Sequence, residues 1–427
     1  MKQISLLFKI HQPLQLRSYR FFDIGQDHYY YDDFTNKSNL LKAAKQSYLP
    51  MNNLLLELVA AHKKNFKVSF SISGTMLEQF EKYVPELIES FQKLAATGNV
   101  DFGGETYSHS LASVANEQEF EKQALAHSEK IKQLFGIAPT VFANTDLIYS
   151  DAIGEQVFNM GFKGMIAEGA KQVLGWKSPN FLYCNANNPR LKVLLRNYKL
   201  SDDVSLRFSN SSWSEYPLTA DKFLSWVQAI PENEEVVNLV FDYKTFGTYQ
   251  KAETGIFDFF KSFVNQAIDS KIVFPTCSET IHTLQPVSVL SVPSITSCIN
   301  EERDLTTVIG NNLQKQAIEG LTNLSQHMKS VSDAGIIADW NKIQNSDHLY
   351  YMSMNLVQEE SPYPTHYEAF INYMNVISDM NERIAKAPKT ESLDNLSNEE
   401  IDSEIEKHSA ILKQLMDLKK HQKKNKK

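Results

Sequence analysis

The sequence predicts an α/β fold of the barrel type, with about seven strand–helix steps, followed by a helical extension. Two observations indicate this. Short, densely apolar runs alternate with amphipathic helical stretches over the first two-thirds of the 427-residue chain. Such runs are typical of parallel strands that are buried on both faces. From about Pro286 the strand-like runs stop, and helical periodicity continues to about Met380.

Composition and charge exclude several classes of protein. The chain is 42% hydrophobic with a net charge of −8, which argues against a nucleic-acid backbone as its main partner. Its three cysteines, Cys184, Cys277 and Cys298, form no CxxC motif, so neither a disulfide framework nor a zinc cluster is expected. The N-terminal apolar run is too short for a signal peptide, and no run is long enough to span a membrane. We therefore expect a cytoplasmic protein without a membrane partner.

The predicted elements follow one another along the chain. The predicted strands cover residues 4–10, 66–72, 100–104, 140–143, 165–167, 191–195, 204–208, 236–241 and 272–275. The predicted helices cover about residues 51–63, 77–96, 117–135, 151–160, 220–230, 257–268, 312–328, 334–343, 367–384 and 398–420. These patterns predict a barrel domain over residues 1–285, a helical domain over residues 286–385, and a polar, partly helical tail over residues 386–427.

Four polar residues stand just after predicted strands, namely His11, Glu105, Glu168 and Asp242. A lone acid at a strand end most often caps a helix. In parallel barrels, however, the strands end at one rim, where the chemistry sits. Two carboxylates on one rim, Glu168 and Asp242, suit hydrolysis of a glycosidic bond. The pair would lie about 5–5.5 Å apart in a retaining enzyme and about 6.5–9.5 Å apart in an inverting one. The residues alone leave the role of each acid open.

A metal site and a serine or cysteine nucleophile are the alternatives. His11, Glu105 and His109 could converge on a metal ion, but the chain has no HxH or HExxH motif. Polysaccharide deacetylases use an HSxxH motif, and here Ser113 stands where the second histidine would be. No GxSxG, GxGxxG or P-loop motif is present. Metal-dependent carbohydrate chemistry therefore stays a minor alternative.

Five motifs occur in a characteristic order. They are HQP (11–13), GGETYSHS (103–110), MIAEGAKQVLGW (165–176), FDYKTFG (241–247) and SDHLYYM (346–352). In order and spacing they resemble the signatures of glycoside hydrolase family 57, which includes α-amylases, 4-α-glucanotransferases and branching enzymes. The likeness extends from residue 1 to about residue 380.

The resemblance implies an incomplete (β/α)7 barrel, a C-terminal helical domain that caps the active-site face, and a retaining mechanism. It assigns Glu168 as the nucleophile and Asp242 as the general acid/base. The implied substrate is an α-1,4-glucan such as starch, glycogen or a maltooligosaccharide, and no metal or organic cofactor is implied. The resemblance and its motifs place further residues around the sugar, namely His11, Gln12, Glu105, His109, Trp176, Tyr243, Phe246, Asp347 and His348.

Several positions depart from the family pattern. Lys244 stands where relatives carry Glu, and further replacements are Thr248-Tyr249 for Glu-His, Ala143 for Arg, and Cys298 and Val308 for Trp. If the strand continued past Asp242, Lys244 would face the same side, and a cation there would lower the pKa of Asp242. These changes keep open a second hypothesis, a catalytically impaired paralogue that binds α-glucan or a protein partner. The sequence favours neither hydrolysis nor transglycosylation, and it leaves the oligomeric state open.

Overall fold

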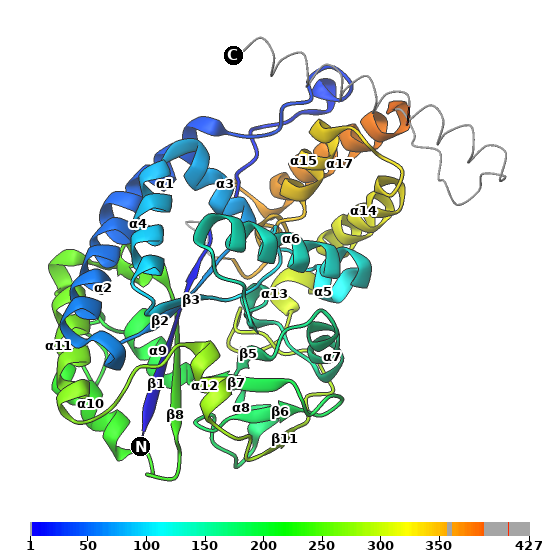
Figure 1. Cartoon of the computed structure of the whole chain (residues 1–427). Coiled ribbons are helices and arrows are strands. Elements are labelled where there is room, and N and C mark those ends of the chain that lie inside the picture. The colour runs from blue at the N-terminus through cyan, green and yellow to red at the C-terminus, as the bar shows by residue number, and fades with distance from the viewer. Residues whose placement is uncertain (1, 357–360, 388–408, 410–427) are drawn as a thin grey trace, which may run out of the picture.

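A computed structural model of the chain describes residues 2–356, 361–387 and 409. Seven parallel strands form a barrel in which they follow one another in chain order (Figure 1). They are β1 (Gln3–Ile10), β2 (Val68–Ile72), β3 (Val100–Phe102), β4 (Val141–Phe142), β5 (Gly164–Glu168), β7 (Lys192–Arg196) and β8 (Val236–Asp242). Between β3 and β4 only the single bridge Gly104–Phe142 forms in the described chain. The prediction of an incomplete seven-stranded α/β barrel with a helical extension is confirmed.

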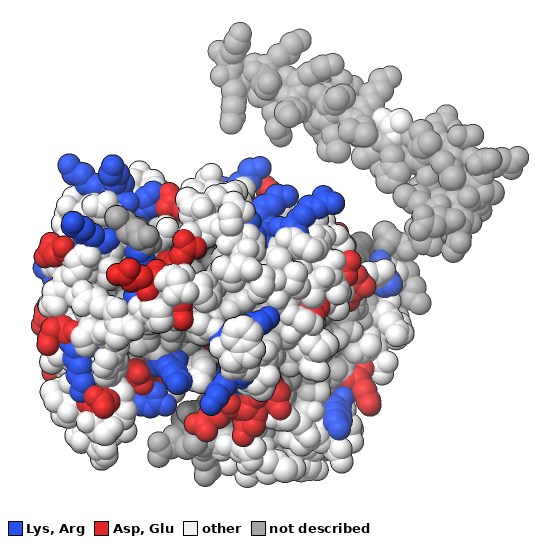
Figure 2. Space-filling view, turned by 90° about the horizontal axis from the view of Figure 1, so that it is seen from below, with Lys and Arg blue, Asp and Glu red and all other residues white. Residues whose placement is uncertain are grey.

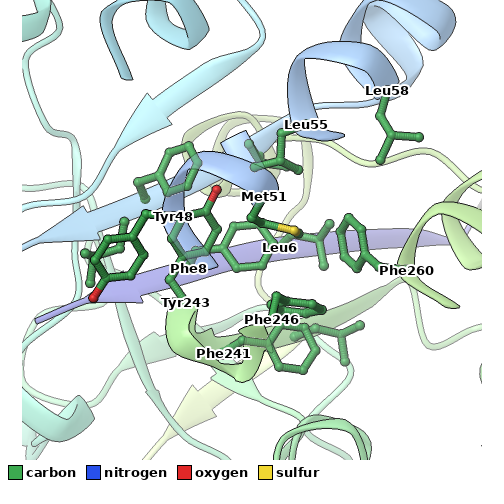
Figure 3. Close-up of a cluster of buried hydrophobic side chains, with 14 of the residues drawn as sticks. Leu6, Phe8, Tyr48, Met51, Leu55, Leu58, Phe241, Tyr243, Phe246 and Phe260 are labelled. Carbon is green, nitrogen blue, oxygen red and sulfur yellow. The ribbon is translucent and has the colours of Figure 1, made fainter. Parts of the chain in front are cut away.

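Strand β1 lies at the centre of the largest aromatic cluster, shown in Figure 3. Phe8 lies within 6.2 Å, centroid to centroid, of five aromatic rings, those of Phe70, Phe241, Tyr243, Phe246 and Phe260. Such pairs each contribute about 0.5–1.5 kcal/mol beyond burial of their area. The cluster fixes β8 against β1, so the strand ends that carry Asp242 and His11 lie on one rim.

Helices surround the barrel, with α1 to α4, α10 and α11 along one side and α5 to α7 along another (Figure 1). Their bounds are α1 (Asp33–Ala43), α2 (Leu49–His62), α3 (Gly74–Tyr83), α4 (Pro85–Ala96), α5 (Ala112–Ala115), α6 (Glu117–Phe135), α7 (Asp151–Asn159), α8 (Lys171–Leu174), α9 (Tyr198–Ser205), α10 (Ala220–Ala229), α11 (Ile256–Asp269) and α12 (Cys277–Thr283). The helix expected over residues 77–96 is two helices, because Pro85 lacks the N–H that would continue α3 and starts α4 instead.

Two predicted strands are wrong. Residues 204–208 belong partly to α9, which begins where the Asn197 side chain accepts a hydrogen bond from the Leu200 N–H at 3.2 Å. That cap favours a helix over the extended conformation suggested by the apolar residues. Residues 272–275 form only isolated bridges, Gln3–Val273 and Phe66–Phe274, at the start of the barrel.

Strand pairing continues past Pro286. The short strand β11 (Ser288–Leu290) pairs with β6 (Tyr183–Asn185), so the expectation that strands end there is corrected. The helices that follow are α13 (Thr306–Ile309), α14 (Asn312–Met328), α15 (Ala334–Ile343), α16 (Asp347–Tyr350) and α17 (His366–Lys386). The domain limits at residues 285 and 385 remain predictions, and the tail from residue 388 lies outside the described residues except for Ser409.

A buried acid ties α17 to the N-terminal segment. Asp379 accepts hydrogen bonds from the Gly25 N–H at 2.7 Å and the Tyr30 hydroxyl at 2.5 Å, and it pairs with His28 at 2.8 Å. Figure 1 shows this segment alongside α17 and α15.

None of the described helices combines the length and the apolar character needed to cross a bilayer. On the face in Figure 2, acidic and basic side chains are interspersed, so no patch of a single sign forms there.

Candidate active site

A cleft of about 930 Å³ opens where the barrel strands end. His11 after β1, His109 after β3, Asp146 after β4 and Asp242 at the end of β8 line it, and Asp347 of α16 reaches it from the helical region. Strand ends that are far apart in sequence, together with α16, thus bring the carboxylates of Asp146, Asp242 and Asp347 and two imidazoles to one rim. This is the place where parallel barrels carry their chemistry.

Asp242 is exposed in the cleft, and a turn fixes its carboxylate. The strand ends because Tyr243–Thr245 form a 3-10 turn, which Asp242 caps through the Lys244 N–H at 2.8 Å. The Tyr249 hydroxyl donates to the other carboxylate oxygen at 3.3 Å. The acid is therefore oriented by its own loop while remaining open to a substrate.

The same turn determines where the Lys244 side chain lies relative to the Asp242 carboxylate. Its ammonium lies 5.7 Å from the centroid of the Tyr249 ring, and no ion pair joins it to Asp242 within the described chain. Burial opposes the charge of Lys244, but the carboxylates of Asp242 and Asp347 raise its pKa above the ordinary value. A cation stands near the acid without bonding to its carboxylate.

Glu168 is enclosed behind the cleft wall. Its side chain is 0% exposed, and one carboxylate oxygen pairs with Arg196 at 3.0 Å and with Arg303 at 3.3 Å. Asp202 pairs with the same two guanidinium groups, at 2.5 Å from Arg196 and 3.2 Å from Arg303, which closes a ring of four charges. Burial raises the pKa of Glu168, and the two guanidinium groups oppose that rise. The guanidinium groups line the cleft, whereas Glu168 does not.

Strand register explains the depth of Glu168. It pairs with Arg196, which in turn pairs with Asn238 of β8. Strand β8 continues beyond Asn238 before it reaches Asp242. Glu168 is therefore level with a deeper part of β8 than Asp242 is, and the space between is filled by guanidinium groups.

Asp146 is the acid that the sequence reasoning did not select. It lies in a 3-10 turn, Thr145–Leu147, just after β4, with its side chain 24% exposed in the cleft. Its carboxylate is 3.7 Å from His109 Nε2. The available signal was its position, because it follows a predicted strand just as the selected residues do. For Lys9, Arg196 and Asp202 the sequence offered weaker indications of a place in the cleft, and for Arg303 it offered no indication.

Backbone strain concentrates at the cleft. Six non-glycine residues of the described chain have a positive φ, and four of them line the cleft, namely His109 (51°), Asp146 (47°), Leu147 (52°) and Arg303 (59°). This conformation is unusual, especially for a bulky residue such as Leu147. Each such residue costs about 1–3 kcal/mol, and they persist mainly at functional sites. The surrounding fold therefore holds this rim in a shape that the local sequence disfavours.

Two histidines stack face to face in the cleft. The rings of His11 and His109 lie 3.9 Å apart with an interplanar angle of 13°. His11 bonds to Ser73 Oγ at 2.7 Å and to Asp347 Oδ2 at 2.9 Å, and burial lowers its pKa. Burial opposes a charge on His109, but the carboxylates of Asp146 and Glu105 raise its pKa to about 9. A neutral imidazole thus stacks on a cationic one.

These residues fit a hydrogen-bonded network better than a metal site. His11, His109 and Asp347 each offer one possible ligand atom, all within 4.8 Å of one another. Because the two rings are nearly parallel, their in-plane lone pairs do not converge on one point. Metal binding also requires deprotonated ligands, whereas the raised pKa of His109 favours its proton.

The remaining residues predicted to contact sugar do not line the cleft. They are Gln12, Glu105, Trp176, Tyr243, Phe246 and His348. Tyr243 and Phe246 belong to the aromatic core, and the Tyr243 hydroxyl donates to Asn52 at 2.5 Å. Trp176 is 93% exposed elsewhere on the surface. His11, His109, Asp242 and Asp347 are the predicted residues that the fold brings together in the cleft.

Glu105 supports the rim from below. It is buried, lies 3.7 Å from the Lys9 ammonium and accepts a hydrogen bond from Ser71. Burial raises the pKa of such a group, but Lys9 and His109 lower that of Glu105 to about 2. Its fixed negative charge in turn stabilises the imidazolium of His109.

The imidazolium of His109 predicts a specific pH dependence of stability. The folded-state pKa of about 9 exceeds the ordinary 6.5, so its contribution is full below about pH 6.5 and is lost as the pH rises through about 9. His109→Gln is expected to lower the free energy of unfolding by about 3 kcal/mol near pH 6 and by much less near pH 10. Denaturant unfolding at both pH values checks this, with the exposed His327→Gln as control. An equal deficit at both pH values would contradict it.

Comparison with known proteins points to one family. The model of glycosyl hydrolase family 57 matches residues 5–293. A protein of Methanocaldococcus jannaschii named "Putative alpha-amylase" is 34% identical over 438 residues, which cover 96% of this chain and 92% of that protein.

Solved structures share the fold at low sequence identity. The chain is similar to a family 57 branching enzyme from Thermococcus kodakaraensis, with a TM-score of 0.68, 10% identity and 90% of each chain covered. It is similar to the 4-alpha-glucanotransferase from Thermococcus litoralis (TM-score 0.67, 14% identity), with 90% of this chain and 60% of that one covered. The alpha-amylase AmyC from Thermotoga maritima gives a TM-score of 0.62 at 13% identity, with 90% and 94% covered. At these identities the likeness describes the fold.

Proposed function

Because this chain belongs to glycosyl hydrolase family 57, we propose that it cleaves or transfers α-1,4-linked glucosyl units with retention of configuration. The observation that carries the proposal is the carboxylate of Asp242, exposed and oriented in a cleft at the barrel rim. The substrate class comes from the family and from the mixed polar lining of the cleft. A cytoplasmic location remains a prediction.

Asp242 is suited to the role of general acid/base. The Lys244 N–H and the Tyr249 hydroxyl hold the carboxylate in place. In a retaining reaction such a group protonates the leaving oxygen while a second carboxylate attacks the sugar. It then removes a proton from water, giving hydrolysis, or from a sugar hydroxyl, giving transfer.

Two acids are candidates for the nucleophile. The family resemblance names Glu168, which reaches a sugar only if Arg303 moves off its carboxylate. Asp146 already lines the cleft together with Asp242. Its place in the cleft, 3.7 Å from the cationic imidazole of His109, therefore favours Asp146.

Substrate hydroxyls would be bound by the polar rim. His11 and Asp347 already form a hydrogen-bonded pair that faces the cleft. The ionised carboxylate of Asp347 supplies oxygen acceptors, and His11, whose two ring nitrogens bond to Ser73 and Asp347, holds that carboxylate in place. Burial raises the pKa of a carboxyl group, but His11 lowers that of Asp347 to about 2, which supports a charged acceptor across the working pH range.

A second candidate function is glucan binding with poor turnover. The enclosure of Glu168 by Arg196 and Arg303 favours it, as does the ammonium of Lys244 near Asp242. In that case the cleft would hold sugar while one carboxylate stays unavailable for attack.

Incubation of the purified protein with maltoheptaose tests the proposal. Reducing-end assays and chromatography of product lengths separate hydrolysis from transfer, and proton NMR of early products reports the anomer. We expect α-anomeric products from the wild type and none from Asp242→Asn. If neither protein forms products while both bind glucan, the enzymatic proposal fails and the binding function replaces it. Loss of activity with a chelator would instead favour metal-dependent chemistry.

A further inference from the structure

We propose that a second cleft, outside the barrel rim, binds a distal part of a long α-glucan whose reacting bond lies in the active-site cleft. We call it the outer cleft. The inference rests on the proposed function and extends it, because it makes long polymers the preferred substrate.

The outer cleft lies between the N-terminal segment and the first turns of α17, which run side by side in Figure 1. Its volume is about 1320 Å³, larger than the 930 Å³ of the active-site cleft. One wall is formed by residues 15–21, with Asp32 and Thr35. The other is formed by residues 361–364, 367, 368, 371, 372 and 375.

Exposed aromatic rings stand among polar groups in this cleft. Phe21 is 71% exposed and Tyr367 is 57% exposed. Large exposed apolar groups with a polar rim mark binding grooves. The side chains of Arg20, Glu368 and Asn375 in the walls offer planar donors and acceptors of the kind that sugar hydroxyls bind. Flat rings for the C–H faces of glucose, together with such groups, make a neutral carbohydrate the matching ligand.

The backbone of the cleft is already fixed in place. The Tyr19 N–H donates to the Asn372 side chain at 2.7 Å, and the amide of Asn372 donates to the Arg17 carbonyl at 3.1 Å. The Asn375 amide donates to the Tyr19 carbonyl at 3.0 Å. These bonds hold the two walls together without a ligand, so binding costs little ordering of the protein.

Two tyrosines, Tyr351 and Tyr363, lie between the outer cleft and the helical turn that carries Asp347. A smaller hollow of about 220 Å³ shares Tyr363 and its neighbours with the outer cleft and reaches Tyr351. The rings of Tyr351 and Tyr363 lie 5.9 Å apart. The Tyr351 N–H donates to the carbonyl of Asp347, which lines the active-site cleft. The hollow next to the outer cleft thus comes within one helical turn of Asp347 in the active-site cleft, and this proximity is what favours a polymer of the same sugar as the occupant of the outer cleft.

The test removes both exposed rings, in the variant Phe21→Ala with Tyr367→Ala. Phe34→Ala is the matched control, because its ring is 84% exposed and does not line the outer cleft. Affinity electrophoresis in gels that contain amylose measures polymer binding independently of catalysis. We expect the double variant to bind amylose at least about tenfold more weakly, a loss of about 1.4 kcal/mol, because both exposed rings are removed. Turnover of maltotetraose should be unchanged.

The outcomes separate this inference from the proposed function. Unchanged amylose binding by the double variant would overturn the proposal that the outer cleft binds glucan, whatever the catalytic activity of the protein. Equal loss of activity on amylose and maltotetraose would also overturn it, because a distal site acts only on long chains. A dimer in sedimentation that the double variant abolishes, with amylose binding intact, would assign the cleft to a second copy of the chain. If the double variant binds amylose more weakly while the wild type turns over no substrate, the outer cleft is retained as a binding site and the enzymatic function is rejected.

Discussion

Asp242→Asn is expected to lower kcat on maltoheptaose by about 10²- to 10⁴-fold, the usual contribution of a general acid/base. The amide occupies the same volume and still accepts the Lys244 N–H bond, but it cannot deliver a proton to the leaving oxygen. Substrate binding should change little, because the loss falls on the transition state. Steady-state kinetics of both proteins measure this.

Leaving-group dependence makes the assignment of Asp242 specific. A substrate with an acidic leaving group, such as a nitrophenyl α-glucoside, needs little protonation and should lose far less rate in the variant than maltoheptaose does. Asp203→Asn is the control, since Asp203 also lines the cleft but pairs with Arg207 at 2.7 Å. Equal losses on both substrates would argue that Asp242 only shapes the cleft.

Asp146→Asn is expected to lower kcat by at least about 10³-fold if Asp146 is the nucleophile. Glu168→Gln should behave differently, because it removes a buried carboxylate from its ion pairs with Arg196 and Arg303. Asp202 stays paired with both guanidinium groups, so the loss of the second carboxylate costs about 1–3 kcal/mol of stability. The predicted pattern is therefore lost activity with retained stability for Asp146→Asn, and lost stability with substantial remaining activity for Glu168→Gln.

Kinetics and denaturant unfolding of the two variants, measured side by side, check this pattern. Added azide can replace a missing carboxylate nucleophile, so it should restore turnover of the activated glucoside in Asp146→Asn. If azide instead rescues Glu168→Gln and Asp146→Asn keeps its activity, Glu168 is the nucleophile. In that case Arg303 must leave the carboxylate during the reaction.

The sequence by itself determined the barrel, its helical extension and four residues of the cleft, namely His11, His109, Asp242 and Asp347. Buried parallel strands need continuous apolar runs, and these are visible locally. His11 and Asp242 could be selected because each follows such a run directly. The turn after Asp242 was harder to foresee, since Tyr243 and Phe246 look exposed in the motif yet fill the aromatic core around Phe8.

Only the tertiary structure decided which acids line the cleft. Glu168 and Asp146 both follow predicted strands, so local sequence treats them alike. They differ in whether they line the cleft, and this difference comes from the strand register of Glu168 and from Arg303. Arg303 is 135 residues away from Glu168 along the chain and pairs with its carboxylate. Ion pairs between distant segments leave no periodic trace in a sequence, because they depend on where loops meet in space. For the same reason the outer cleft, formed where the N-terminal segment meets α17, became visible only in the fold.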